Sequence, residues 1–472
     1  MRSGNGRMSP SLRSCQSERS PDMDKDIAAC YMNARLPRYT SYPTAPHFSD
    51  VVSQETYANW LSSLSYSQTA SLYLHIPFCR SMCWYCGCHT TITRQDTKII
   101  DYLSVLREEI ELVAKQLSRP LSVNHLHFGG GTPTIISPDE FRALMDLLRR
   151  RFLFTDDAEV AVEIDPRRLT GKMIDTLGAT GVTRASLGVQ TLDPLVQKAI
   201  NRIQGYEQVA AVTDGLRAAG VAGVNFDLIY GLPNQTPESC IATVKQCLEL
   251  LPGRFAVFGY AHVPDFKKHQ RKIDESALAD AEGRLAQADA IKRTLLGAGY
   301  EEIGIDHFAL PDDPMAQAQR QGALHRNFQG YTTDVSDVLI GLGASAIGRL
   351  EQGYVQNNVV LGRYAARVSQ GQFATTKGLE LTNEDRLRAE IIERLMCDFR
   401  VDLGTVCNRF GEDPASILQD TPQLQALAAD GLIQIDGDVV SLAEDNRFLV
   451  RNVASAFDSY LEASGRTFSR AV

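Results

Sequence analysis

Residues 71–88 read SLYLHIPFCRSMCWYCGC, and the interpretation of the whole chain starts from this stretch. Its first six residues form a short apolar run that predicts a strand, and Pro77 stops the strand because proline cannot continue a ladder. A loop follows at once, with thiols at Cys79, Cys83 and Cys86 in a Cys-x3-Cys-x2-Cys spacing. Three thiolates on a cubane iron–sulfur cluster would leave one iron free to bind a small molecule.

The alternative for this loop is a zinc site in which Cys88 is the fourth ligand. Structural zinc ligands usually come as two separated pairs, and a Cys-Gly-Cys segment is a cramped pair for one tetrahedral ion. We therefore predict Cys79, Cys83 and Cys86 as cluster ligands and leave Cys88 outside the ligand set. The other six cysteines are scattered along the chain, and we assign them no function.

The overall composition is that of an ordinary globular protein. The 472 residues are 44% hydrophobic and 22% charged, which suits two or three domains with a sizeable core. A net charge of −9 disfavours general binding to nucleic acid or to an anionic membrane surface. The sequence contains no long uncharged apolar run, so no membrane span is expected, and a cytoplasmic location is predicted.

From about residue 70 the chain alternates short apolar runs with helical patterns, which predicts βα units around a parallel sheet. The expected strands are 71–76, 123–128, 159–164, 184–189, 223–228 and 255–258. Six units in sequence favour an α/β fold with a partial (β/α)6 barrel over a doubly wound sheet. The cysteine loop, a glycine run at 129–131, Glu163, Gln190, Asp227 and Ala261 all fall at carboxyl ends of these strands. In parallel barrels that rim carries the active site.

Each of these residues also has a structural interpretation. The glycine run lacks the pattern of a phosphate or dinucleotide loop, and alone it is a tight turn; at the rim it offers exposed backbone to an amino-acid-like ligand. Glu163 and Asp227 suit ribose hydroxyls or an ammonium group, although single carboxylates more often act as caps or ion-pair partners. The residue types of Gln190 and Arg202 alone predict no function, and their position beside the same rim makes them candidate site residues.

The remaining segments suggest four parts of the chain. Residues 1–25 are expected to be a disordered tail and 26–69 an arm, in which 37–43 could cover the opening of the barrel. The barrel is expected to span 70–360, and 361–472 a mainly helical C-terminal domain. A hairpin at 432–442 with an Asp-Gly turn makes that domain winged-helix-like. Because fold does not imply function, we interpret it as a lid or packing domain.

Long segments of the chain resemble one family. The cysteine loop resembles that of the radical S-adenosylmethionine (SAM) enzymes. From about Pro37 to the C-terminus the chain resembles the oxygen-independent coproporphyrinogen III oxidase (coproporphyrinogen dehydrogenase) family, most clearly in segments 37–44, 75–79, 128–134, 227–233 and 325–331. The resemblance implies a radical-SAM barrel with a [4Fe–4S] cluster on the three cysteines. It also implies oxidative decarboxylation of two propionates of coproporphyrinogen III to vinyl groups through a 5′-deoxyadenosyl radical.

By the same resemblance the family holds two molecules of SAM. The residues matching the site at the cluster are Tyr73, Tyr85, Gly130, Glu163 and Ile347. The residues matching the second site are Gly131, Thr132, Gln190, Arg202, Asp227 and Ala261. No residue departs from the family pattern at these positions. An electron donor and an electron acceptor are implied as partners without being identified, and a monomer is expected.

The substrate implied by the resemblance carries four carboxylates, so an acidic protein must provide a local basic pocket for it. Arg38 and Arg326 are our candidates for that role. Two other interpretations remain. One is the related haem chaperone, which usually lacks the cysteine matching Cys88 and the arm around Arg38. The other is a zinc-stabilised scaffold with a DNA-binding winged domain, which the negative net charge disfavours.

Overall fold

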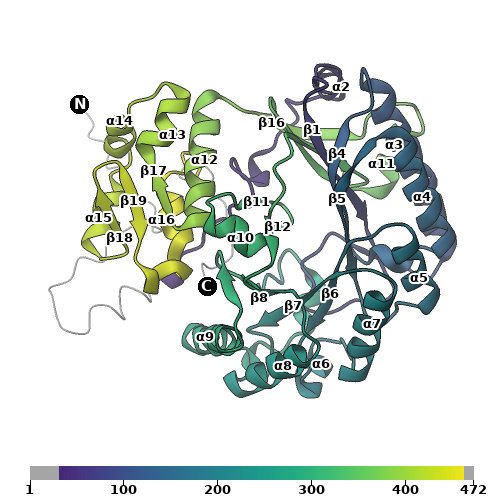
Figure 1. Ribbon diagram of the computed structural model, residues 1–472, viewed down its shortest axis with the longest axis horizontal. Coiled ribbons are helices and arrows are strands. Elements are labelled where there is room, and N and C mark those ends of the chain that lie inside the picture. Colours follow the sequence, from purple (N-terminus) through teal and green to yellow (C-terminus); the bar gives the residue numbers. More distant parts are fainter. Residues whose placement is uncertain (1–30, 462–472) are drawn as a thin grey trace.

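The computed structural model describes residues 31–461, so the tail expected at 1–25 lies outside the described residues (Figure 1). Within this range the strands form a twelve-stranded sheet and three small sheets. The large sheet and its helices make one lobe, and the C-terminal elements make a second lobe beside it (Figure 1). No helix in residues 31–461 combines the length and apolarity needed to cross a bilayer.

Six parallel strands confirm the predicted βα series. They lie side by side in chain order: β1 (Thr69–Ile76), β4 (Ser122–Gly130), β5 (Leu153–Ile164), β6 (Arg184–Gln190), β7 (Gly223–Tyr230) and β8 (Arg254–Gly259). Parallel order places all their carboxyl ends on one rim. Strand β7 continues past the predicted end at 228, so Asp227 lies inside the strand and lines the barrel lumen.

Helices cover the outer face of these strands (Figure 1). They are α3 (Asp96–Gln116), α4 (Pro138–Arg151), α5 (Gly171–Ala179), α6 (Pro194–Ala199), α7 (Tyr206–Ala218), α8 (Pro237–Glu249) and α9 (Ala281–Gly297). Ser137 caps α4 by accepting from the amide of Glu140, and Pro138 occupies its first turn. Buried apolar side chains between the sheet and these helices form the main core. Cys240 and Cys247, two of the cysteines without an assigned function, belong to it.

The sheet extends beyond the six units at both edges. On one side β13 (Val338–Leu342) runs parallel to β1, and β14 (Ile347–Leu350), β15 (Gly353–Asn357) and β16 (Thr375–Glu380) continue antiparallel. On the other side β10 (His307–Ala309) and β9 (Glu301–Ile303) follow β8. The two edges do not pair with each other, so the barrel stays open on one flank.

A short hairpin lies against that open flank. It consists of β11 (His325–Asn327) and β12 (Gly330–Thr332), preceded by α10 (Pro314–Arg320). Residues of this hairpin and of the strands enclose a lumen of about 200 Å³ whose walls include Glu163 and Asp227. The hairpin therefore closes the side of the lumen that the sheet leaves open.

The second lobe is built from α12 (Asn383–Asp398), β17 (Arg400–Asp402), α13 (Leu403–Phe410), α14 (Pro414–Gln419), α15 (Gln423–Ala429), β18 (Ile433–Asp436), β19 (Val439–Leu442) and α16 (Val450–Ala456). The predicted hairpin is β18–β19, and Gly437 in its turn has a φ of 57°, which glycine adopts readily. Helices around the three-stranded sheet β17-β19-β18 agree with the winged-helix-like expectation. In the remaining elements, α2 (Gln54–Ser62) and α11 (Leu361–Val368) pack on the barrel.

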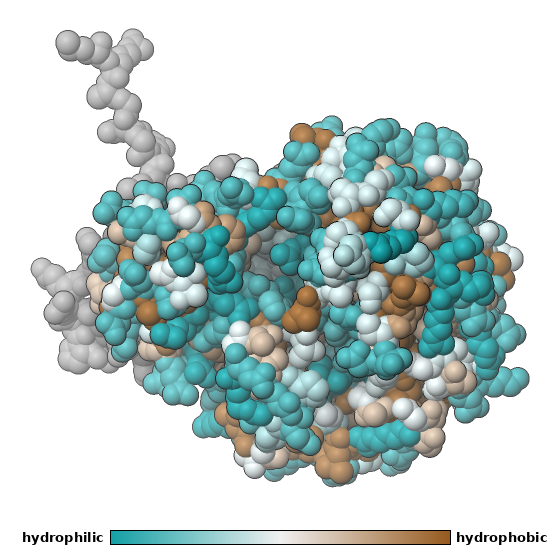
Figure 2. All heavy atoms as spheres, turned by 45° about the horizontal axis from the view of Figure 1, so that its top comes forward, coloured by the Kyte–Doolittle hydropathy of each residue, from teal (hydrophilic) through white to brown (hydrophobic). Residues whose placement is uncertain are grey.

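The arm joins the two lobes. Met32, Tyr39 and Tyr42 belong to the apolar core of the C-terminal lobe, whereas Trp60 in α2 belongs to the barrel core. The ring of Phe48 stacks on Tyr354 of β15. Hydrophilic side chains dominate the face seen in Figure 2, and the hydrophobic patches visible there are small and separate.

Candidate active site on the barrel rim

The cysteine loop is fixed at its base by a two-stranded pairing. Strand β2 (Phe78–Cys79) runs parallel to β3 (Thr91–Ile92), and the amide of Thr93 donates to the carbonyl of Cys79 at 3.0 Å. The middle of the loop is held by the residue that follows α6, since the amide of Trp84 donates to the carbonyl of Ile200 at 2.9 Å. A loop anchored at both places keeps its thiols at the carboxyl end of β1.

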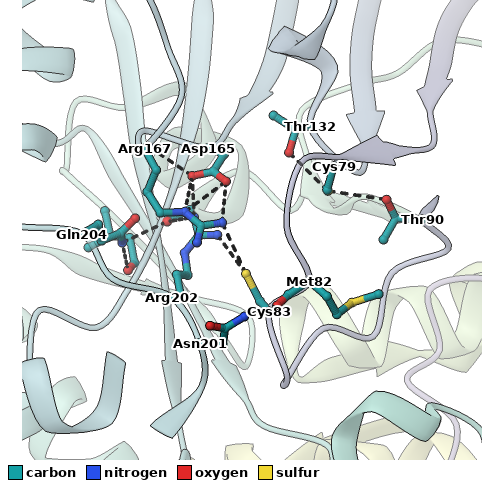
Figure 3. Close-up of polar contacts among 12 residues, drawn as sticks. Cys79, Met82, Cys83, Thr90, Thr132, Asp165, Arg167, Asn201, Arg202 and Gln204 are labelled. Carbon is teal, nitrogen blue, oxygen red and sulfur yellow. Dashed lines mark hydrogen bonds and ion pairs between the residues drawn. The ribbon is translucent and has the colours of Figure 1, made fainter. Parts of the chain in front are cut away.

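The thiols of Cys79 and Cys83 have different neighbours (Figure 3). The sulfur of Cys79 lies 3.3 Å from the Thr132 hydroxyl and 3.5 Å from that of Thr90. Cys83 is buried, and its sulfur accepts from Arg167 Nη2 at 3.4 Å and Arg202 Nη1 at 3.5 Å. Two guanidinium groups thus donate to the sulfur of Cys83.

Asp165 holds the two guanidinium groups in place. Its carboxylate pairs with Arg167 at 2.7 Å and with Arg202 at 3.4 Å. Burial opposes ionisation of Asp165, but the hydrogen bond from Arg167 and the charge of Arg202 lower its pKa overall. The pKa of Arg202 is raised despite burial, because Tyr85, Asp165 and Cys83 surround it. Arg202, predicted from its place at the rim and from the family resemblance, thus lies against a predicted cluster ligand.

The pKa of the third thiol, Cys86, is lowered from its ordinary value. A hydrogen bond from Cys88 lowers the pKa of Cys86 to about 6 against the effect of burial, and the charges of His269 and Lys267 add to this. Burial raises the pKa of Cys79, and the pKa of Cys88 is raised by its bond to Cys86. Cys88 therefore acts as the donor to Cys86 in this structure.

The donor set of the loop fits an iron–sulfur cluster. It offers three thiols, with cations beside two of them, and thiolates are the ligands that such clusters use. Among residues 31–461, no three His, Cys, Asp or Glu side chains gather closely enough to hold a single metal ion. Thiolates bound to different irons of a cubane need not converge as the ligands of one zinc ion do.

The carboxylate of Glu163 faces the rim from β5. It accepts from the amide of Gly130 at 3.1 Å and from His127 Nε2 at 3.2 Å. Enclosure by the barrel opposes ionisation, but these hydrogen bonds and the charge of His127 lower the pKa of Glu163. Tyr73 of β1 lies beside this group, with its ring stacked on His127. An ionised carboxylate next to glycine backbone can receive an ammonium group.

Asp227 of β7 also lines the lumen. The hydroxyl of Ser186 donates to it at 2.8 Å. Burial raises the pKa of Asp227 to about 6 against that hydrogen bond, and the charge of Glu163 adds to the rise. Two lumen carboxylates thus differ in their tendency to ionise, because only Glu163 has a histidine within hydrogen-bond distance.

The other predicted residues lie around the same rim. A Cβ atom built on Gly188 would lie 2.8 Å from Gln190 Nε2 and 3.0 Å from Arg202 Nη2, so both side chains converge there. Gly131 and Thr132 donate their amides to the carbonyls of Ile76 and Phe78. Ile347 begins β14, whose partner strands are β13 and β15.

One buried glutamine connects Ala261 to the cysteine loop. Gln270 Nε2 donates to the carbonyls of Ala261 at 3.2 Å and of Tyr85 at 3.0 Å. The neighbouring His269 donates to the carbonyl of Cys86 at 2.7 Å. Sequence reasoning missed these two residues, and also Asp165, Arg167 and His127. The Asp165-Pro166-Arg167 segment after β5 was the available signal, because it ends a strand at the same rim.

The comparisons with known proteins agree with this site. The family model described as the radical SAM superfamily matches residues 73–247, and the model described as the HemN C-terminal domain matches residues 381–449. The fold and the three-thiol rim thus define a radical SAM barrel with an additional C-terminal domain. The solved coproporphyrinogen III oxidase of Escherichia coli, described as a radical SAM enzyme, superposes with a TM-score of 0.86 at 41% identity, covering 90% of this chain and 98% of its own.

Curated relatives show which family of radical SAM proteins the chain matches. The oxygen-independent coproporphyrinogen III oxidase of Bradyrhizobium diazoefficiens is 58% identical over 95% of this chain and 100% of its own length. That of Salmonella typhimurium is 41% identical over 97% of this chain and 100% of its own. The chain belongs to the oxygen-independent coproporphyrinogen III oxidase family.

Proposed function

We propose that the chain converts two propionate side chains of coproporphyrinogen III to vinyl groups without oxygen, giving protoporphyrinogen IX in haem biosynthesis. The observation that carries the proposal is the anchored three-thiol loop, which opens on the same rim as the lumen lined by Glu163 and Asp227. Relatives that carry this activity in their names match the chain over nearly its full length.

Cys79, Cys83 and Cys86 would hold a [4Fe–4S] cluster. When bound, this group would supply the electron for reductive cleavage of SAM, and the resulting carbon radical would take the β-hydrogen of a propionate. The substrate then releases CO2 and one electron, which requires an electron acceptor besides the donor that reduces the cluster. We infer that these partners are separate molecules, that the enzyme acts as a monomer, and that it works in the cytoplasm.

The residues around the cluster have distinct roles in this proposal. Glu163, already ionised and beside the Gly130 amide, would receive the ammonium group of the first SAM, with Tyr73, Tyr85 and Ile347 around it. Gly131, Thr132, Gln190, Arg202, Asp227 and Ala261 would contact a second SAM. The closeness of Gln190 and Arg202 around Gly188 supports their acting at one site. The hairpin β11–β12, which lines the lumen, would keep water from the open flank, as radical chemistry requires.

The chain is divided into an arm and two domains in this proposal. We infer an arm at 26–69, a barrel that begins at 70, and a helical C-terminal domain. The expected boundary lay at 360/361. Strand β16 ends at Glu380 and still belongs to the barrel sheet, and the C-terminal family match begins at 381; both support a boundary near 380.

The test is anaerobic reconstitution with iron and sulfide, followed by incubation with SAM, a chemical reductant and coproporphyrinogen III. Vinyl product and CO2 are expected in a ratio of one CO2 per vinyl group. Cys83→Ser should lose both the brown cluster and turnover, while Cys240→Ala, in a buried helix position, should keep them. If the wild-type enzyme binds the cluster and cleaves SAM but leaves the propionates intact, coproporphyrinogen III is not its substrate.

A further inference from the structure

Four arginines from distant parts of the chain meet where the arm, the barrel and the C-terminal lobe come together. They are Arg38 of the arm, Arg284 of α9, Arg326 of β11 and Arg451 of α16. Arg326 Nη2 donates to the carbonyl of Arg38 at 3.4 Å, and the Arg326 guanidinium stands 4.4 Å from the ring centre of Tyr331. Arg451 is buried, and burial together with the charges of Arg38 and Arg326 lowers its pKa to about 10.

The guanidinium group of Arg326 has hydrogen-bond donors that the described residues do not satisfy. Asp306 is close enough to Arg38 and Arg326 for their charges to lower its pKa, but its carboxylate is also bonded to His307 at 2.6 Å. The Nε and Nη1 atoms of Arg326 are buried and have no hydrogen-bond partner among residues 31–461. Bringing like charges together in a partly buried place is unfavourable unless an anion joins them. Because the Nε and Nη1 groups of Arg326 are hydrogen-bond donors without an acceptor among residues 31–461, such an anion would need to accept hydrogen bonds from them.

The cluster adjoins the lumen at the carboxyl ends of β7 and β8. Arg284 stands 5.5 Å from the ring centre of Tyr230, the last residue of β7, and a Cβ on Gly259, which ends β8, would lie 3.0 Å from Arg284 Nη2. Tyr331, under Arg326, lines the lumen itself. The cations thus stand where β7 and β8 end, beside the lumen.

We propose that Arg326, Arg451 and Arg38, with Arg284 at the rim, form a clamp for the two propionates that the reaction does not remove. The inference rests on the proposed function, which supplies a substrate with four carboxylates. A guanidinium fork binds a carboxylate through paired charge-assisted hydrogen bonds. Such bonds stabilise the carboxylate anion before reaction and would raise the barrier for its loss as CO2. The clamp therefore holds the carboxylates that persist in the product and leaves the reacting ones toward the lumen.

The test measures binding of coproporphyrin III, the oxidised and fluorescent form of the substrate, to the reconstituted enzyme without air. Arg326→Met and Arg451→Met should each weaken its affinity by on the order of tenfold to a hundredfold, because each removes a charge-assisted pair. The KM for coproporphyrinogen III should rise by a similar factor. Cleavage of SAM in the absence of substrate should stay unchanged. Arg363→Met, which alters an exposed arginine of α11, is the matched control and should bind as the wild type does.

The tetramethyl ester of coproporphyrin III separates the clamp from general porphyrin binding, since it carries no carboxylate. It should bind wild type and variants alike, and more weakly than the free acid. If Arg451→Met fails to fold, Arg326→Lys and Arg451→Lys keep the charge but lose the fork, and they should show intermediate affinity. Wild-type affinity in all arginine variants, or equal binding of acid and ester, would overturn the clamp. If the wild type does not convert coproporphyrinogen III at all, the proposed function fails instead.

Discussion

At the scale of single residues, the surroundings of Cys83 distinguish it from the other thiols. Two guanidinium groups donate to its sulfur, and Asp165 fixes both of them. Hydrogen bonds and positive charge at a ligand sulfur stabilise the reduced, more negative state of an iron–sulfur cluster. Arg167 is therefore expected to act on the redox potential without being a ligand.

Replacing Arg167 should shift that potential. Arg167→Met keeps much of the side chain's length but removes the charge and the donors, so the reduction potential of the cluster should become more negative by on the order of tens of millivolts. A redox titration followed by electron paramagnetic resonance measures this shift. Arg168→Met removes the same charge from an exposed neighbour and serves as control. Equal shifts in the two variants would mean that net charge alone, and not the bond to Cys83, sets the potential.

The raised pKa of Asp227 predicts a pH-dependent stability. Because burial raises its pKa from 3.8 to about 6, the folded state favours the neutral acid. This stabilising contribution is fully present below the unfolded pKa and is lost as pH rises through about 6, leaving a cost of about 2–3 kcal/mol at pH 8. Asp227→Asn should thus raise the denaturation midpoint of SAM-free enzyme more at pH 8 than at pH 5, because at pH 5, between the unfolded and folded pKa values, only about half of this cost is present. The exposed Asp214→Asn should change neither, and a uniform effect at both pH values would contradict the assignment.

At the scale of elements, helix α3 positions the turn that leads into β14. Glu109 is buried and accepts from the amide of Gly343 at 2.6 Å, from Asn357 Nδ2 at 2.5 Å and from the Tyr364 hydroxyl at 2.7 Å. Tyr102, two turns earlier in the same helix, accepts from the amide of Ala344. One helix therefore holds the 343–346 turn beside the sheet, immediately before Ile347.

Glu109→Gln should destabilise the barrel although it preserves size. All three partners of Glu109 donate hydrogen bonds, so the new amide group would face a donor and leave buried polar atoms unsatisfied. A loss of about 2–3 kcal/mol in unfolding free energy is expected. Chemical denaturation followed by circular dichroism measures it, with the exposed Glu108→Gln as control. If both variants unfold at the wild-type denaturant concentration, the network does not support the turn.

At the scale of the whole molecule, the arm ties the C-terminal lobe to the barrel. Tyr39 and Tyr42 are buried in the C-terminal core, and their hydroxyls bond Asp458 at 3.0 Å and Ser459 at 2.9 Å. Ser49, in the same arm, pairs with Gly378 of β16. Arg38 directly precedes Tyr39 in the chain. Burial of Tyr39 in the C-terminal lobe therefore also fixes the position of Arg38 in the arginine cluster.

Tyr39→Ala should release the arm from the C-terminal lobe. Removing a buried aromatic side chain costs about 3–5 kcal/mol, and the buried carboxylate of Asp458 would lose its hydroxyl partner. Limited proteolysis should then cut between residues 31 and 50 faster than in the wild type. Tyr66→Ala changes an exposed tyrosine and should leave the cleavage rate unaltered. An unchanged rate in Tyr39→Ala would show that other contacts hold the arm.

The sequence by itself determined the βα series and the position of the cysteine loop. Both depend on local features: apolar runs of strand length, Pro77 after β1, and a capped helix start at Ser137. Parallel order then places strand ends on one rim, so Glu163 and Gln190 could be predicted there without coordinates. The cysteine spacing is equally local.

Only the tertiary structure decided which distant side chains meet. Arg167 and Arg202 converge on Cys83 because β5 and α6 both end at the cysteine loop, and Gln270 joins Ala261 to Tyr85 across a loop of the chain. The arginine cluster draws on four separate elements. Such encounters depend on packing angles and on the register between elements, and short-range sequence patterns carry neither, since periodicity fixes a face of an element but not its partner.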